Sequence, residues 1–230
     1  MLQMELTKKS DEKDVEVQGN EEKNNKEKRG MLIVFEGCDR TGKTSQSKLL
    51  FEKMKNEGQQ VKLMNFPDRD TATGKVIHSH LTNDIVHTDE CIHLLFSANR
   101  WERRKEMEQM LLQGINIIVD RYSYSGVAFS CAKGLDLEWC KMSEKGLLKP
   151  DVVIYLKGCD MSYRNGFGNE RYETKEMQKK VFDMYEQMII EDLNTNWKII
   201  DANQHIFVIA ELIQKEVMRK DIDEHPCLLW

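Results

Sequence analysis

Residues Gly37-Cys38-Asp39-Arg40-Thr41-Gly42-Lys43-Thr44 fit the pattern GxxxxGK[ST], and this stretch constrains the fold more than any other feature. It follows a short apolar run at 31–35 and precedes a helical pattern at 42–57. In such a loop, backbone N–H groups and a helix N-terminus surround an anion. The chain is therefore expected to bind a nucleoside triphosphate, and ATP is the nucleotide that we expect. The loop alone does not distinguish a kinase from a switch GTPase or a motor.

Short apolar segments alternate with helical patterns along the rest of the chain. We predict strands at 31–35, 61–66, 115–120, 151–156 and 197–201, and helices at 42–57, 88–112, 122–133, 136–145, 174–194 and 204–220. Strands that alternate with helices indicate an α/β fold with a five-stranded parallel sheet and helices on both faces. With no internal repeat, residues 30–230 are expected to form a single domain.

Residues 1–29 have mixed charges, no aromatic side chain and few apolar ones, so we expect a disordered tail. Its acidic residues argue against a mitochondrial presequence. The chain has a net charge of −5, which does not favour nucleic-acid binding, and no apolar run long enough to span a membrane. Six cysteines without a CxxC pair favour a reducing compartment, which would be the cytoplasm or the nucleus.

Arginines follow two of the predicted strands at the point where each strand ends. Arg69 comes after the second strand, and Asp120 and Arg121 end the third. Because ligands bind at the carboxyl ends of parallel strands, Lys43, Arg69 and Arg121 are expected to share one crevice. This is more positive charge than one triphosphate needs, so the pattern predicts two phosphate-bearing ligands and phosphoryl transfer between them.

Two further features suggest how an acceptor is held. Phe96 and Arg100 lie one turn apart on a predicted helix, where a ring could stack on a base and a guanidinium could donate to a carbonyl oxygen. The glycine-bearing segment 163–173 carries Arg164 and Arg171 and is expected to act as a lid that excludes water.

The sequence resembles the thymidylate kinases over about residues 30–230. The motifs FEG.DR.GKT, LLFSANRWE, VDRY.YSGVAF and ERYE occur in the order of that family, with an arginine in the phosphate loop as in its eukaryotic and poxviral branch. The resemblance implies a P-loop NTPase fold and a homodimer to which the long helix contributes. It also implies the transfer of the γ-phosphoryl group of ATP to dTMP, giving ADP and dTDP for dTTP synthesis, with Mg²⁺.

The resemblance further implies a role for each matching residue. Phe96 would stack on thymine, Arg100 would donate to its O4, and Arg69 and Arg121 would hold the monophosphate. Asp39 would meet the sugar 3′-hydroxyl and Tyr172 would crowd the 2′ position. The remaining walls of the dTMP pocket would be Phe66, Leu81, Ser125 and Gly126. The ATP side would comprise Gly37, Asp39, Arg40, Thr41, Gly42, Lys43, Thr44, Ser45 and Arg164, with Arg40, Lys43 and Asp39 as the catalytic residues.

Several alternatives stay open from the sequence. Thr44 would bind Mg²⁺ directly, whereas Asp120 could bind it through water or merely orient Arg121. Cys38, at a helix N-terminus, could be an oxidisable thiol or a small buried filler. A deoxynucleoside kinase would phosphorylate a 5′-hydroxyl with a carboxylate base and would have less use for Arg69 and Arg121. A switch or an inactive scaffold would bind nucleotide without turnover, but the sequence has no guanine-reading NKxD motif.

Overall fold

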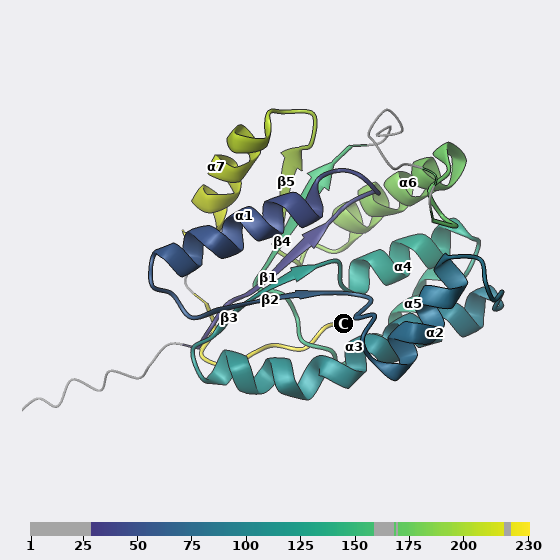
Figure 1. Ribbon diagram of the computed structural model, residues 1–230, viewed down its shortest axis with the longest axis horizontal. Helices are drawn as coiled ribbons and strands as arrows, with labels where there is room; N and C mark the ends of the chain where they lie inside the picture. The colour runs from purple at the N-terminus through teal and green to yellow at the C-terminus, as the bar shows by residue number, and fades with distance from the viewer. Residues whose placement is uncertain (1–28, 159–167, 169, 219–221) are drawn as a thin grey trace, which may run out of the picture.

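The computed structural model describes residues 29–158, 168, 170–218 and 222–230. Its centre is a parallel sheet with the strand order β2-β3-β1-β4-β5 (Figure 1). The strands are β1 (Leu32–Glu36), β2 (Val61–Asn65), β3 (Asn116–Asp120), β4 (Val152–Lys157) and β5 (Trp197–Asp201). The predicted five-stranded α/β fold is therefore confirmed.

Helices cover both faces of the sheet (Figure 1). They are α1 (Lys43–Asn56), α2 (Ala72–Leu81), α3 (Asp89–Leu112), α4 (Ser123–Ala132), α5 (Leu137–Met142), α6 (Lys175–Glu191) and α7 (Ile206–Val217). The long helix begins where its sequence predicts, because the Thr88 side chain accepts a hydrogen bond from the Cys91 N–H and Asp89 and Glu90 lie in the first turn. None of the helices in the described residues is long and apolar enough to cross a membrane.

The two faces of β1 point into two separate cores, as alternation along a strand requires. Ile33 and Phe35 pack with Leu50 of α1 and Ile213 of α7. On the opposite face, residues of β1 pack with α3, α4 and α6. Because β1 is buried on both sides, its sequence is continuously apolar up to Glu36.

The sequence analysis missed α2. Its first turn contains Gly74 among threonines, a composition typical of a loop. The glycine is required by packing, because a Cβ there would lie 1.8 Å from the carbonyl oxygen of Asp68. Thr71 caps the helix by accepting a hydrogen bond from the Gly74 N–H at 3.0 Å. The helix matters for the site because it ends at Leu81.

The domain begins slightly earlier than expected. Arg29, which we assigned to the disordered tail, is buried and forms an ion pair with Asp151 at 2.6 Å. The Asp151 carboxylate also accepts a hydrogen bond from the Leu32 N–H at 2.7 Å, so this pair anchors the start of β1. The rest of the predicted tail, residues 1–28, lies outside the described residues.

Candidate functional site

The loop between β1 and α1 has the backbone of a phosphate cradle. Gly37 and Gly42 have φ angles of 140° and 99°, which other residues rarely adopt. A Cβ at Gly37 would also lie 2.6 Å from the carbonyl oxygen of Leu156 in β4. The strand order changes direction at β1, and ligands of open α/β sheets bind at such a switch point. The glycines are therefore explained by both conformation and space.

Lys43 is buried beneath this loop. Its Nζ donates a hydrogen bond to the carbonyl oxygen of Cys38 at 2.5 Å. Burial and the nearby Arg121 guanidinium together lower the pKa of Lys43 to about 8, against the smaller opposing effect of Asp39 and Asp120. An anion in the cradle would raise this pKa again, so a bound phosphate would keep the Lys43 ammonium protonated.

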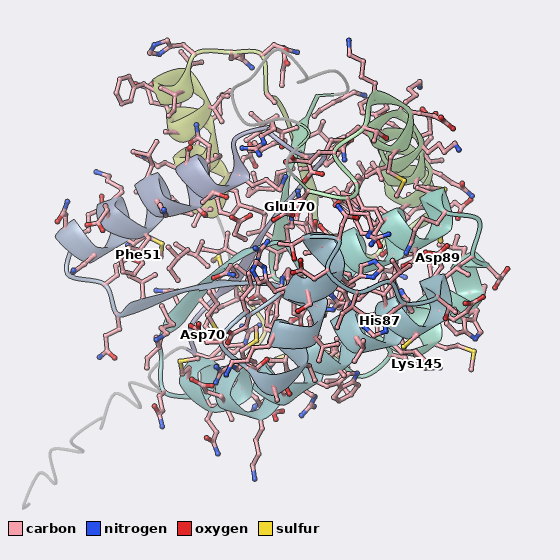
Figure 2. The ribbon with its side chains drawn as sticks, turned by 45° about the vertical axis from the view of Figure 1, so that its right-hand side comes forward. Phe51, Asp70, His87, Asp89, Lys145 and Glu170 are labelled. Carbon is pink, nitrogen blue, oxygen red and sulfur yellow. The ribbon has the colours of Figure 1, made fainter. Side chains whose placement is uncertain are left out.

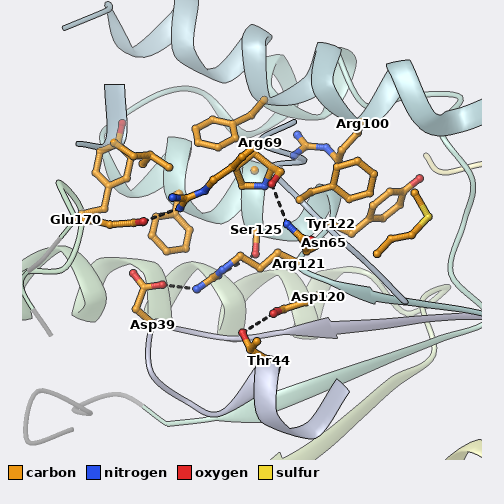
Figure 3. Close-up of a pocket in the computed structure, with 18 of the residues that line it drawn as sticks. Asp39, Thr44, Asn65, Arg69, Arg100, Asp120, Arg121, Tyr122, Ser125 and Glu170 are labelled. Carbon is orange, nitrogen blue, oxygen red and sulfur yellow. Dashed lines mark hydrogen bonds and ion pairs between the residues drawn. The ribbon is translucent and has the colours of Figure 1, made fainter. Parts of the chain in front are cut away.

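Thr44 and Asp120 meet at the adjacent strand end, with the threonine hydroxyl donating to Asp120 Oδ2 at 2.5 Å (Figure 3). Asp120 Oδ1 is buried and has no hydrogen-bond partner among the described residues. Hydroxyl and carboxylate oxygens are the donors that Mg²⁺ prefers. The unpartnered oxygen fits a cation or its water better than it fits an orienting role, because Arg121 makes its hydrogen bonds elsewhere.

Beside the loop lies a cavity of about 400 Å³ (Figure 3). Twelve of the residues predicted for the site line it: Asp39, Thr44, Phe66, Arg69, Leu81, Phe96, Arg100, Asp120, Arg121, Ser125, Gly126 and Tyr172. These residues come from α1, α2, α3 and α4, from the ends of β2 and β3, from the phosphate loop and from the segment before α6. The predicted convergence of arginines, aromatic side chains and loop residues is thus present in the fold.

Arg121 occupies the centre of the cavity wall. It has a φ angle of 69°, in the left-handed region that non-glycine residues rarely adopt, and such residues concentrate at functional sites. Its guanidinium pairs with Asp39 and donates to the carbonyl oxygen of Gly37 at 3.1 Å and to Ser125 Oγ at 3.2 Å. Burial alone would lower the pKa of Arg121, but Asp39 and other anions outweigh it and raise the pKa. The arginine is a fixed cation.

Asp39 is held from two sides. Oδ1 of Asp39 accepts a hydrogen bond from Arg121 Nη2, and Oδ2 accepts a hydrogen bond from Gln178 Nε2 at 2.6 Å. Gln178 also accepts from the Asp39 N–H at 2.7 Å, so a side chain of α6 holds this part of the phosphate loop. The sequence analysis did not identify Gln178, because nothing in the pattern of α6 distinguishes it from another buried polar residue.

Arg69 reaches the cavity from the opposite side (Figure 3). Its side chain is 42% exposed and pairs with Glu170 at 2.6 Å. It also lies 3.0 Å from His78 Nδ1 of α2. Arg69 is therefore a more exposed cation than Arg121, whose side chain is 21% exposed.

Aromatic and apolar side chains form the remaining wall. Phe66 and Leu81 are buried, and Phe96 is partly exposed beside them. The Tyr172 hydroxyl lies 2.7 Å from His80 Nε2 of α2. Burial raises the pKa of Tyr172 to about 12, so its hydroxyl remains neutral. Asp89, the first residue of α3, lies toward one edge of the molecule in the view of Figure 2.

Arg40 points away from the cavity. It has a φ of 62°, and its guanidinium pairs with Glu173 at 2.9 Å. Glu173 also accepts hydrogen bonds from the Gly168 and Glu170 N–H groups, so the arginine contacts the described end of the predicted lid.

The other residues predicted for the ATP side do not line the cavity. They belong to the phosphate loop and to α1: Gly37, Thr41, Gly42, Lys43 and Ser45. Arg164 lies outside the described residues.

Two buried glutamates of the site were missed. Glu36, at the end of β1, accepts from the Tyr122 and Ser125 N–H groups and from the Tyr185 hydroxyl, which fixes the turn around Arg121. The sequence did contain a signal for Glu36, because it is an acidic residue at the end of an otherwise apolar strand. Glu144 pairs with Arg100, and neither side chain is more than 2% exposed. Its segment gave no such signal.

Comparisons with known proteins agree on one family. The family model described as thymidylate kinase matches residues 35–213. The chain is 49% identical to the thymidylate kinase of Arabidopsis thaliana over 195 residues, which cover 83% of this chain and 72% of that protein. It is 42% identical to the human thymidylate kinase over 209 residues, covering 88% and 98%. A solved thymidylate kinase structure from Candida albicans superposes with a TM-score of 0.77 at 34% identity, covering 88% and 99%.

Proposed function

Because the chain belongs to the thymidylate kinase family and so phosphorylates dTMP with ATP, we propose that the phosphate loop holds ATP and the cavity beside it holds dTMP. One observation carries this assignment: Asp39 and Thr44 of the loop line the same cavity as Arg69, Arg121 and Phe96. A volume of about 400 Å³ is in the range of small-molecule sites, which is about 300–1,000 Å³.

In this assignment the base lies between Phe96 and the apolar wall, and Arg100 donates to a carbonyl oxygen of the base. The sugar lies near Asp39 and Tyr172, and the monophosphate between Arg69 and Arg121. Ser125 and Gly126 of α4 complete the floor. Lys43 and Arg40 stabilise the phosphates of ATP.

The acceptor needs no strong base. A phosphate monoester has a second pKa of about 6, so the attacking oxygen is already ionised at neutral pH. Catalysis then consists of alignment and charge stabilisation. Arg121 fixes the acceptor oxygen because its own position is set by Asp39, Gly37 and Ser125. Lys43 and Arg40 supply positive charge to the transferring group.

The Mg²⁺ site would comprise Thr44 and, through water, Asp120. The cation supplies charge neutralisation on the phosphates of ATP. The buried and unpartnered Oδ1 of Asp120 supports this role over the orientation of Arg121.

Replacement of Asp120 by asparagine tests the metal assignment. We expect the Mg²⁺ concentration that gives half-maximal activity to rise about 10- to 100-fold, the usual cost of losing an outer ligand partner. Activity is measured against Mg²⁺ concentration, and Mn²⁺ binding to the protein with ATP is measured in parallel. Thr44→Ser, which keeps the hydroxyl, is the matched control. An unchanged Mg²⁺ requirement in Asp120→Asn would instead support an orienting role.

We further propose a homodimer that uses α3 and resides in the cytoplasm. Leu94, Trp101 and Leu112 of α3 are 48%, 40% and 54% exposed. Their spacing of 7 and 11 residues places them on one face of the helix, where a second copy of the chain would cover them.

The cytoplasmic location is proposed from the cysteines. Those of the described residues are free thiols, which suits a reducing compartment.

A panel of nucleoside monophosphates with ATP and Mg²⁺ tests the assignment of the cavity. We expect dTMP to be phosphorylated with the highest kcat/KM, because the Arg100 guanidinium meets a carbonyl oxygen of its base. Thymidine, which lacks the phosphate that Arg69 and Arg121 hold, serves as the matched control and should not be phosphorylated. Turnover of thymidine would favour a deoxynucleoside kinase, and dTMP binding without dTDP formation would favour a scaffold.

A further inference from the structure

A buried ion pair in the cavity wall joins Arg100 of α3 to Glu144, 44 residues later. The Arg100 side chain is 2% exposed and that of Glu144 is not exposed. Nε donates to Oε2 at 2.8 Å, and Nη2 donates to Oε1, so the pair is bidentate. Such a pair fixes the plane of the guanidinium as well as its position.

Glu144 is itself held in place by one face of α3. His93 Nε2 lies 3.1 Å from the carbonyl oxygen of Cys140. Ser97 Oγ and Trp101 Nε1 both donate to the carbonyl oxygen of Ser143 at 2.8 Å. His93, Ser97 and Trp101 follow one another at four-residue spacing, so they share a face with Arg100. The helix therefore positions the carboxylate that in turn positions its own arginine.

A glycine closes the other side of the guanidinium. A Cβ at Gly126 of α4 would lie 2.5 Å from Arg100 Nη2 and 3.1 Å from its Cζ. Only a residue without a side chain leaves room for the guanidinium here. Gly126 and Arg100 both line the cavity, and Arg100 lies at the end of it away from Glu170 (Figure 3).

We propose that Glu144 is a positioning residue that determines which pyrimidines the enzyme accepts. The proposal rests on the assignment of Arg100 to the base. An arginine has five N–H donors and no acceptor, and Glu144 uses two of them. Among the hydrogen bonds of the described residues, none uses the Nη1 donors of Arg100. These groups can donate a hydrogen bond to a carbonyl oxygen at position 4 of a pyrimidine, but they cannot pair with the amino group that cytosine carries there.

Glu144 has a second effect on the same contact. It neutralises the charge of Arg100, so that the buried end of the cavity holds a dipolar donor and not an isolated cation. Without the carboxylate, the guanidinium would be free to turn toward other acceptors or toward water. The selectivity for a carbonyl oxygen depends on this fixed orientation, since an unpaired buried donor opposite an amino group is what disfavours the wrong base.

The experiment compares dTMP and dCMP in the Glu144→Gln variant. We expect KM for dTMP to rise about 10- to 100-fold with a much smaller change in kcat, because the orientation of Arg100 affects ground state and transition state alike. The ratio of the dCMP to the dTMP dissociation constants should fall by a similar factor, while KM for ATP stays unchanged. Glu108→Gln is the matched control, because it alters an Arg–Glu pair of α3 at Arg104 that does not line the cavity.

Thermal denaturation separates positioning from a purely structural role. A variant with both Arg100→Met and Glu144→Met replaces the buried pair by apolar side chains and should regain the Tm that Glu144→Gln loses. We expect this folded double variant to remain unable to discriminate dTMP from dCMP. A folded Glu144→Gln protein with the original dissociation-constant ratio would overturn the proposal. If Arg100→Met also keeps that ratio, the assignment of Arg100 to the base is itself wrong.

Discussion

Replacement of Arg40 by alanine is expected to lower kcat by about 10³- to 10⁵-fold, the range for an arginine that stabilises phosphoryl transfer. The dissociation constants of ATP and dTMP should change far less, because the contact strengthens as charge develops in the transition state. In the structure Arg40 belongs to the phosphate loop but pairs with Glu173, so its guanidinium is held near the loop and not in the dTMP cavity. Single-turnover kinetics and equilibrium binding of each nucleotide measure the two effects separately.

Glu173→Gln is the matched control for this experiment. It keeps the guanidinium and removes only the carboxylate charge that holds it. If the pair is a resting position for Arg40, the control should lose less than about tenfold in kcat, since a partly exposed ion pair contributes about 0–1 kcal/mol. A kcat of Arg40→Ala within tenfold of the unaltered enzyme would contradict a catalytic role.

Replacement of Arg121 by methionine is expected to lower kcat/KM for dTMP by about 10²- to 10³-fold. The substitution removes a fixed phosphate ligand and also leaves Asp39 without its cation. Truncation of one partner of a hydrogen-bonded charge pair costs about 2–5 kcal/mol. Steady-state kinetics with dTMP as the varied substrate measure the change, and KM for ATP should be affected much less.

Arg69→Met provides the comparison. This arginine is proposed to hold the same monophosphate, but its side chain is twice as exposed as that of Arg121. We expect a loss of no more than about tenfold, because solvent already screens its interactions and its ion pair contributes about 0–1 kcal/mol. If the two variants lose equal activity, the lower exposure of Arg121 does not make it the more important phosphate ligand.

The alternation of strands and helices could be predicted from the sequence because the central strands β1, β3 and β4 are buried and nearly continuously apolar, and because glycines end two of the helices. Gly58 and Gly114, for example, follow α1 and α3 with left-handed backbones. The helix α2 could not be predicted in this way, since Gly74 serves a tertiary contact with the carbonyl oxygen of Asp68. The helical pattern of α2 itself contains no information about a contact with a residue outside the helix.

The cations of the site were predictable for a similar reason. Parallel strands place their carboxyl ends together, so Arg69 and Arg121 could be placed at the sheet edge beside the phosphate loop from strand boundaries alone. The carboxylates and amides that hold these cations and the loop could not be found. Glu144, Glu173 and Gln178 lie 44, 133 and 139 residues from Arg100, Arg40 and Asp39. Each partner is a polar residue on an otherwise ordinary segment, and only the packed fold shows which cation it faces.

Asp39 and Arg40 are neighbours in the chain, yet their side chains serve opposite sides of the phosphate loop. The left-handed backbone of Arg40 sends its guanidinium toward Glu173, while Asp39 turns toward Arg121 and Gln178. In the proposed assignment, a single peptide unit is therefore shared by the ATP site and the dTMP site. Any shift of this unit on binding one nucleotide alters the place prepared for the other, and by reciprocity the second nucleotide affects the first equally. The phosphate loop can thereby couple the binding of the two substrates, so that the affinity for each depends on whether the other is bound.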